Sequence, residues 1–198
     1  KNQDKPWISS NPNNGDLVVT WTEFDQYGSE KETDRSRIRF SLSKDQGKTW
    51  TQAVTLSDHE GNCLDDDLTP EGAVPGFGPS NEIYVCWAYD QKLWFDKSAD
   101  GGNTWLPADQ SPVDQPGGWS LEVPGVGRAN GMPVLATDLS PGKYRGSIYI
   151  CWADLKNGQN DMDIWLLSSR DGGNSWSERI RVNQDKTSRI QFFPWLSV

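Results

Sequence analysis

Short runs rich in β-branched and aromatic residues recur along the whole chain, and polar segments with Gly, Pro, Asn or Asp separate them. Runs of this length and composition are typical of β-strands. No apolar repeat of about 3.6 residues continues for a useful length, so the pattern predicts an all-β protein with almost no helix. The expected strands fall into three successive units, at 6–8, 16–21, 37–41 and 53–56; at 74–77, 82–87 and 93–95; and at 132–135, 147–152, 163–167 and 179–182.

A Trp closes the second strand of each unit, at positions 21, 87 and 152, with separations of 66 and 65 residues. Four antiparallel strands per repeat, arranged radially, form a β-propeller. The segment at Pro194-Trp195 is similar to the segment at Pro6-Trp7, the first strand of the first unit. It is therefore expected to begin a fourth blade.

We expect a single propeller region over residues 1–198. The predicted blades span about 5–57, 71–113 and 128–185, and the first strand of a fourth spans about 190–198. Propellers usually close with about four to eight blades, so three blades cannot form a ring alone. Two explanations stay open. Either the chain is a piece of a longer protein, with a six-bladed ring expected, or two copies associate to complete one ring.

One eight-residue pattern, Ser-x-Asp-x-Gly-x-(Thr/Ser)-Trp, begins at Ser43, Ser98 and Ser169. Its Asp can accept hydrogen bonds from backbone N–H groups and close a tight turn, and its Gly can adopt a positive φ. Its Trp can fold back as an apolar plug with an indole N–H that needs a partner. The residues expected to build these turns are Asp45, Gly47, Trp50, Asp100, Gly102, Trp105, Asp171, Gly173 and Trp176.

This pattern resembles the Asp-box, or BNR repeat, of the sialidase (neuraminidase) family of β-propellers. Both the predicted blades and the eight-residue turns resemble those of the family, and together they cover the whole chain. The resemblance implies that the turns lie on the face away from the active site. It also implies a secreted or periplasmic glycoside hydrolase with a Tyr nucleophile. An Asp in an early loop serves as acid/base in the family, and by position this catalytic role falls to Asp25 or Asp34. No signal peptide is visible at Lys1, so any targeting segment is expected to have been removed or to lie outside this sequence.

The family's first sugar-binding Arg lies in an Arg-Ile-Pro motif on an early first strand, and that motif is missing here. The corresponding triplets are Asp4-Lys5-Pro6, Ala73-Val74-Pro75, Gly131-Met132-Pro133 and Phe192-Phe193-Pro194. The family's nucleophilic Tyr, its Glu partner and two further Arg belong to later blades. Whether the chain is an enzyme therefore stays open, and alone it is expected to show no sialidase activity.

Loops opposite the predicted turns carry the candidate binding chemistry. In the Gly- and Pro-rich segment 115–131, Trp119 can stack on a sugar ring and Arg128 can bind a carboxylate through two hydrogen bonds. The alternative for each is that it holds the long loop against its blade. The expected substrate-binding residues are Arg128, Trp119, Asn130 and Glu71.

Composition narrows the possible partners. The net charge of −9 argues against nucleic acid and anionic membranes, and no run approaches the roughly 18 apolar residues that a membrane span needs. With three Cys and one His, neither a complete disulfide framework nor a site built from closely spaced metal ligands is expected. Cys86 and Cys151 are expected as small buried side chains. No cofactor is expected, although the run Asp65, Asp66 and Asp67 could bind Ca²⁺ weakly.

The sequence thus predicts a sialidase-like, glycan-directed propeller that acts as an exo-glycosidase on terminal sialic or other acidic sugars. The alternative function is a non-catalytic propeller module that binds a glycan or a protein through its funnel loops.

Overall fold

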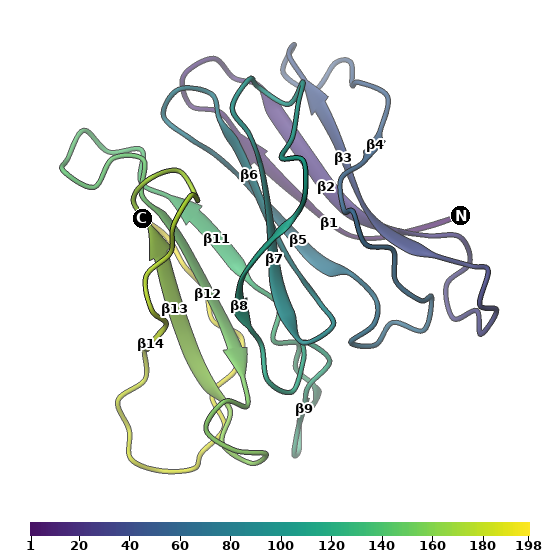
Figure 1. Ribbon diagram of the computed structural model, residues 1–198, viewed down its shortest axis with the longest axis vertical. Coiled ribbons are helices and arrows are strands. Elements are labelled where there is room, and N and C mark those ends of the chain that lie inside the picture. The colour runs from purple at the N-terminus through teal and green to yellow at the C-terminus, as the bar shows by residue number, and fades with distance from the viewer.

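Three four-stranded antiparallel sheets make up the protein in a computed structural model that describes all residues from 1 to 198. The three sheets stand side by side in chain order (Figure 1). The first sheet contains β1 (Asn2–Ser10), β2 (Leu17–Phe24), β3 (Ser36–Ser43) and β4 (Val54–Thr55); the second contains β5 (Glu71–Phe77), β6 (Ile83–Tyr89), β7 (Lys92–Ser98) and β8 (Gln110–Asp114); the third contains β11 (Val134–Thr137), β12 (Ile148–Asp154), β13 (Asp163–Ser169) and β14 (Ile180–Arg181).

Each sheet is a simple meander in which consecutive strands pair. A small hairpin of β9 (Glu122–Val123) and β10 (Gly127–Arg128) lies in the connection between the second and third sheets. No residue is helical, so no helix could span a membrane. The predictions of an all-β chain and of four-stranded antiparallel sheets are confirmed. The three sheets do not close into a ring.

The middle sheet is buried on both faces, and its strand β6 shows how the sequence achieves this. Tyr84 and Cys86 point into the core shared with the third sheet, whereas Val85 and Trp87 point into the core shared with the first. Successive strand residues face opposite sides, so a strand that is covered on both sides must be apolar throughout. The cysteines are free and buried, as predicted for Cys86 and Cys151.

The three predicted turns have one hydrogen-bond pattern, which the turn after β13 illustrates. Ser169 Oγ donates to Asp171 Oδ1 over 2.8 Å, and the Gly173 N–H donates to Ser169 Oγ over 2.8 Å. The Ser175 N–H and hydroxyl both donate to Asp171, over 2.9 and 2.6 Å, and help to lower the pKa of Asp171 to about 2. The same contacts occur in the turns that begin at Ser98 and Ser43.

In the second and third turns the Trp packs against the preceding sheet. Trp176 meets Phe95 edge to face with ring centroids 5.0 Å apart, and Trp105 meets Phe40 in the same way at 4.9 Å. Their indole N–H groups have no hydrogen-bond partner, contrary to expectation. Trp50 belongs to the first sheet, which has no preceding sheet, and it stays 41% exposed. The Trp side chain of a turn is therefore buried only where a neighbouring sheet covers it.

The C-terminal segment 190–198 is not a strand, since no neighbouring strand pairs with it. Its backbone nevertheless resembles the beginning of β1. Phe193 precedes Pro194 with a φ of 54°, as Lys5 precedes Pro6 with a φ of 46°. That the segment opens a fourth blade remains a prediction.

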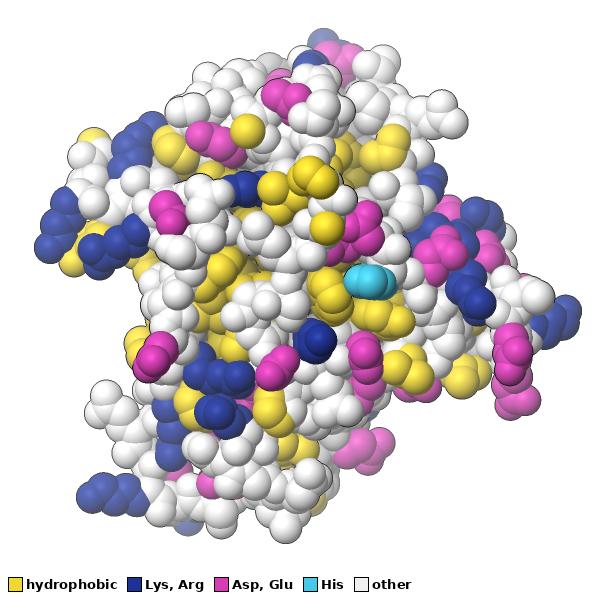
Figure 2. Space-filling view, viewed as in Figure 1, with side chains coloured by type: hydrophobic (Ala, Val, Ile, Leu, Met, Phe, Trp, Pro, Cys, Tyr) yellow, Lys and Arg dark blue, Asp and Glu magenta, His cyan; other side chains and the backbone are white.

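Two aspartates link the outer strands of the first and second sheets. The Asp58 N–H donates to the Asp109 carboxylate over 2.7 Å, and the Asp109 N–H donates to the Asp58 carboxylate over 2.8 Å. Burial and the charge of Asp58 raise the pKa of Asp109 to about 7, and burial raises the pKa of Asp96 to about 6. The single histidine, His59, cyan in Figure 2, lies beside this link with its ring 4.7 Å from that of Trp94.

Replacing Gly173 by Ala should destabilise the fold strongly. Gly173 has a φ of +80°, and an added Cβ would lie 2.5 Å from the Phe95 ring. The left-handed backbone costs roughly 1–2 kcal/mol and overpacking roughly 1–3 kcal/mol more. Gly101→Ala is the matched control, because Gly101 has a φ of +71° but nothing within 4 Å of the added Cβ. If both variants lost the same free energy of unfolding in urea, the contact between the added Cβ and Phe95 would contribute nothing, which would contradict the prediction.

Stability should fall as pH rises through the range in which Asp109 loses its proton. The folded-state pKa of about 7 lies above the ordinary value of 3.8, so the stabilisation is complete below 3.8 and is lost as pH rises through about 7. Asp109→Asn should therefore gain roughly 1–2 kcal/mol over the wild type at pH 8, after allowance for solvent screening, and almost nothing at pH 4. Urea unfolding at both pH values tests this, with the exposed Asp114→Asn as the control. A gain of the same size at both pH values would exclude a titration effect.

Candidate functional site

A β-bulge at the beginning of the first strand occurs in two sheets and forms the base of the site. In β1 the register shifts between Asp4 and Trp7, and in β5 it shifts in the same way between Glu71 and Val74. A bulge inserts one extra residue and redirects the side chains beside it. Asp4 and Glu71 therefore occupy equivalent positions in adjacent sheets.

This register corrects one alignment made from the sequence. The triplet equivalent to Asp4-Lys5-Pro6 in the second sheet is Glu71-Gly72-Ala73, not Ala73-Val74-Pro75. The middle residue has a positive φ in both, 46° at Lys5 and 68° at Gly72. The prolines misled the alignment because the bulge, not the proline, fixes the position. Neither triplet contains an Arg.

The site lies at the end of the sheets opposite the Ser-x-Asp turns. In each meander the first and third strands run in the same direction. The beginning of β1 or β5 is therefore remote from the turn that follows β3 or β7. Three long connections also reach this end, at residues 25–35, 56–70 and 115–133. Functional residues often lie on such loops above a rigid scaffold.

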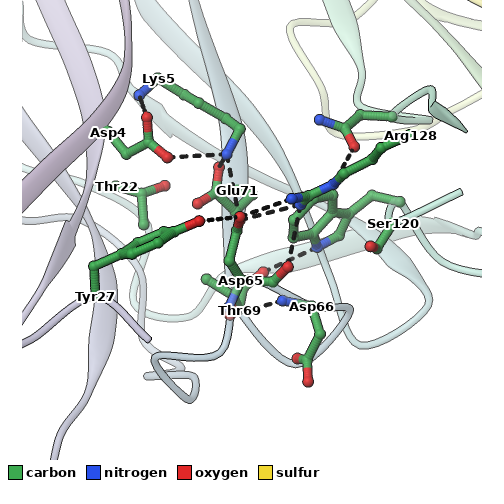
Figure 3. Close-up of polar contacts among 12 residues, drawn as sticks. Asp4, Lys5, Thr22, Tyr27, Asp65, Asp66, Thr69, Glu71, Ser120 and Arg128 are labelled. Carbon is green, nitrogen blue, oxygen red and sulfur yellow. Dashed lines mark hydrogen bonds and ion pairs between the residues drawn. The ribbon is translucent and has the colours of Figure 1, made fainter. Parts of the chain in front are cut away.

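The centre of the site is the Lys5 cluster, which consists of Asp4, Lys5, Asp65 and Glu71 (Figure 3). The Lys5 ammonium lies 3.0 Å from Asp4, 3.4 Å from Asp65 and 2.9 Å from Glu71. One oxygen from each of the three carboxylates lies within 4.8 Å of the others. Burial disfavours the ammonium charge, but the carboxylates of Glu71, Asp4 and Asp65 together outweigh this effect, so the pKa of Lys5 is raised. Lys5 supplies the positive charge that three converging carboxylates need.

Glu71 and Asp65 have pKa values that are shifted in opposite directions. The Glu71 side chain is completely buried, and its Oε1 has no hydrogen-bond partner. Burial raises the pKa of Glu71 to about 7, although Lys5 opposes the shift. Burial also acts on Asp65, but hydrogen bonds from Arg128 and Tyr27 outweigh it and lower the pKa of Asp65. Near neutral pH Asp65 is therefore ionised, whereas the neighbouring Glu71 exchanges its proton readily.

Arg128 binds Asp65 through two hydrogen bonds, over 2.7 and 3.1 Å. Its Nε donates to Asn130 Oδ1 over 2.9 Å, and its guanidinium lies 4.8 Å from the centre of the Trp119 ring. The half-exposed Tyr27 donates its hydroxyl over 2.7 Å to Asp65 Oδ2, which also accepts a hydrogen bond from Arg128. Arg128, Asn130 and Glu71, predicted as substrate-binding residues, thus lie together in the structure.

Trp119 lies beneath the site instead of facing a ligand. It is completely buried, and its indole N–H donates to the Thr69 carbonyl over 3.0 Å. Arg128 and Lys5 lie over its ring. A covered ring has no face for a sugar, so stacking on Trp119 does not fit this structure. The alternative reading, that Trp119 anchors its long loop, does.

Asp25 and Asp34, predicted as acid/base candidates, form no hydrogen bond or ion pair with the Lys5 cluster. Asp25 is paired with Arg37 over 3.0 and 3.1 Å, and this pairing lowers the pKa of Asp25 to about 2. Asp34 accepts a hydrogen bond from Ser29 Oγ over 2.5 Å. A carboxylate with a pKa of about 2 is a poor proton donor at neutral pH.

The carboxylates of the Asp65–Asp67 run do not converge on a common point. Asp65 binds Arg128, Asp66 accepts a hydrogen bond from Asn62 over 2.9 Å, and Asp67 accepts one from the Ser120 N–H over 2.8 Å. A weak Ca²⁺ site at this run, considered from the sequence, stays a prediction. Asp67 ties the loop 56–70 to the loop 115–133.

Sequence reasoning did not select Asp4, Lys5, Tyr27 and Asp65 as substrate-binding or catalytic residues. The sequence does mark Asp4 and Lys5, because Asp4-Lys5-Pro6 lies where the sialidase family has its Arg-Ile-Pro motif. Nothing comparable marks Tyr27 or Asp65. Their positions depend on how two loops from adjacent sheets meet.

No protein-family model matches the chain, and no curated protein matches it. Solved structures do. The NanB sialidase from Streptococcus pneumoniae matches with a TM-score of 0.58 and 11% identity, over 94% of this chain and 40% of that chain. An α-L-arabinanase from Penicillium chrysogenum, complexed with arabinobiose, matches with a TM-score of 0.60 and 17% identity, over 94% of this chain and 51% of that one.

The fold is that of a sialidase-like β-propeller. A second structure of NanB, with Optactamide, agrees, with a TM-score of 0.54, 11% identity and coverage of 91% of this chain and 39% of that one. Identities this low show the fold alone. The chain spans about half or less of the length of these glycoside hydrolase structures.

Removing the Arg128 charge should raise the pKa of Asp65, because its hydrogen bonds are the main effect that keeps this pKa low. In Arg128→Gln we therefore expect Asp65 to keep its proton to a higher pH than in the wild type. Carboxyl ¹³C NMR during a pH titration measures it. Arg145→Gln is the control, since Arg145 is exposed and contacts only the backbone of its own loop. An unchanged Asp65 titration in Arg128→Gln would contradict the pairing.

Proposed function

We propose that this chain belongs to a glycan-directed propeller of the glycoside hydrolase type, and that the Lys5 cluster with Tyr27 and Arg128 receives the sugar. The opposite pKa shifts of Asp65 and Glu71 carry the proposal. Perturbed carboxyl groups at the loop end of a rigid scaffold are typical of functional sites. The likeness to a sialidase and an arabinanase adds support at the level of fold.

Glycoside hydrolysis commonly uses two carboxyl groups, one as acid and one as nucleophile or base. In this site Glu71 would hold the proton and Asp65 the negative charge. Their nearest oxygens are within 4.8 Å, which is closer to the separation of about 5–5.5 Å in retaining enzymes than to the wider spacing of inverting ones. Tyr27 and Arg128 would donate hydrogen bonds to sugar hydroxyls.

The charge of the site favours a neutral sugar over sialic acid. Arg128, predicted to bind an acidic sugar, already has both of its hydrogen-bonding arms on Asp65. A sugar carboxylate would have to displace Asp65 and would then lie among Asp4 and Glu71. The arabinanase structure contains arabinobiose, a neutral disaccharide, which makes a suitable probe.

One observation favours the second candidate function, binding without catalysis. The side chains of Glu71 and Asp65 are only 0% and 8% exposed. Lys5 lies between them and forms an ion pair with each. Neither carboxyl group reaches a glycosidic bond unless Lys5 moves. We therefore expect this chain alone to bind sugar without measurable sialoside hydrolysis.

Calorimetric titration should show arabinobiose binding more tightly than sialyllactose to the wild-type chain. Asp65→Asn should reverse this preference. It should weaken arabinobiose at least about 10-fold, a loss of about 1.4 kcal/mol, and strengthen sialyllactose because Arg128 loses its charged partner. Asp114→Asn, exposed on β8, is the charge-matched control.

The same test includes two hydrolysis assays, one with a fluorogenic sialoside and one with an aryl arabinofuranoside. Turnover of the arabinoside alone would support the hydrolase reading, and binding without turnover would support the binding module. Tighter binding of sialyllactose by the wild type would overturn the choice of a neutral sugar. The absence of binding to either sugar would overturn the proposed function.

A further inference from the structure

A second, apolar pocket lies beside the polar site. Its volume is about 320 Å³, within the usual range for ligand pockets. It lies between the first strands of the first and third sheets and the C-terminal segment. Its apolar side chains come from Trp7, Met132, Val134, Phe193 and Trp195, and its polar side chain is that of Asn130.

Asn130 connects this pocket to the polar site. It lines the pocket, and its Oδ1 accepts the hydrogen bond from Arg128, which in turn binds Asp65. Trp7 gives a second connection, because it follows Lys5 by two residues on β1. The Arg128 side chain is 36% exposed, so a ligand that binds at Arg128 with one end can extend into the pocket with the other.

Two aromatic side chains of this pocket, those of Phe193 and Trp195, are open to solvent, unlike the covered Trp119. Trp195 is 72% exposed and Phe193 is 61% exposed. Trp195 is held against Trp7, with ring centroids 5.6 Å apart and planes tilted by 30°, so one of its faces stays free. The segment itself is fixed by the Gln191 N–H, which donates to the Met162 carbonyl over 2.8 Å.

This composition suits one sugar residue. Indole faces stack on the C–H face of a sugar, and a side-chain amide can both donate to and accept from its hydroxyl groups. No charged side chain lines the pocket, so nothing in it would recognise an acidic sugar. The pocket therefore favours the neutral class of sugar that the polar site also favours.

We propose that the Trp195 pocket is a second sugar subsite, in which Trp195 stacks on one residue of a neutral oligosaccharide and Asn130 binds one of its hydroxyl groups. The adjoining residue of the same oligosaccharide occupies the polar site at Asp65 and Arg128. This inference rests on the proposed function and adds to it a ligand of at least two neutral sugar residues.

Comparison of a disaccharide with a monosaccharide tests the inference. Arabinobiose can fill both subsites, whereas arabinose can fill only one. Trp195→Ala should weaken arabinobiose binding at least about 10-fold and leave arabinose binding unchanged, because arabinose retains the polar site. Trp50→Ala is the matched control, since Trp50 is also exposed but lies at the opposite end of the sheets. Thermal midpoints equal to that of the wild type would exclude misfolding of either variant.

Four outcomes are distinguishable. Unchanged arabinobiose affinity in Trp195→Ala overturns the second subsite but leaves the proposed function intact if Asp65→Asn still weakens binding. An equal loss in Trp50→Ala also overturns it. An equal loss of arabinose and arabinobiose in Trp195→Ala overturns the division into two subsites. A wild-type chain that binds neither sugar overturns the proposed function, and the inference with it.

Discussion

The face-to-face packing of neighbouring sheets is the constraint on which the rest of the structure depends. The middle sheet has an apolar core on each face, and its strand β6 is apolar throughout. Apolar area buried in this way contributes roughly 25 cal/mol per Å², which is the main favourable contribution to folding. The first sheet shows the converse. Its Ile8 is 61% exposed and its Trp50 is 41% exposed, because no sheet covers its outer face.

Face-to-face packing also creates the site. It brings the first strands of adjacent sheets close together, and the shared bulge then directs Asp4 and Glu71 toward one point. Three converging carboxylates repel one another, and the Lys5 ammonium relieves this repulsion. Lys5 and Asp65 both adopt a positive φ, an uncommon conformation for residues other than glycine. Strain of this kind is retained where surrounding contacts fix the backbone, and here the ion pairs of both residues do so.

The loops that complete the site behave as one unit because they are linked in several ways. Asp67 accepts the Ser120 N–H, and Trp119 donates to Thr69. Gly118 has a φ of +70°, and an added Cβ there would lie 2.1 Å from the Asp67 side chain. These contacts fix the position of Asp65 relative to Arg128, which lies on a different loop. They also explain why Trp119 is part of the scaffold.

The sequence by itself determined the class of fold, the three turns and the strands of the three sheets other than β8. Each depends on contacts between residues close in the chain, such as those from Asp171 to Ser169 and Ser175. Only the tertiary structure decided the site. The bulge shifted the true equivalent of Lys5 from the proline-aligned Val74 to Gly72, and the meeting of two loops paired Asp65 with Arg128. Periodicity and composition record which side chains are apolar, but not which distant carboxylates come together. That depends on the packing of the sheets, which buries Glu71 and raises its pKa.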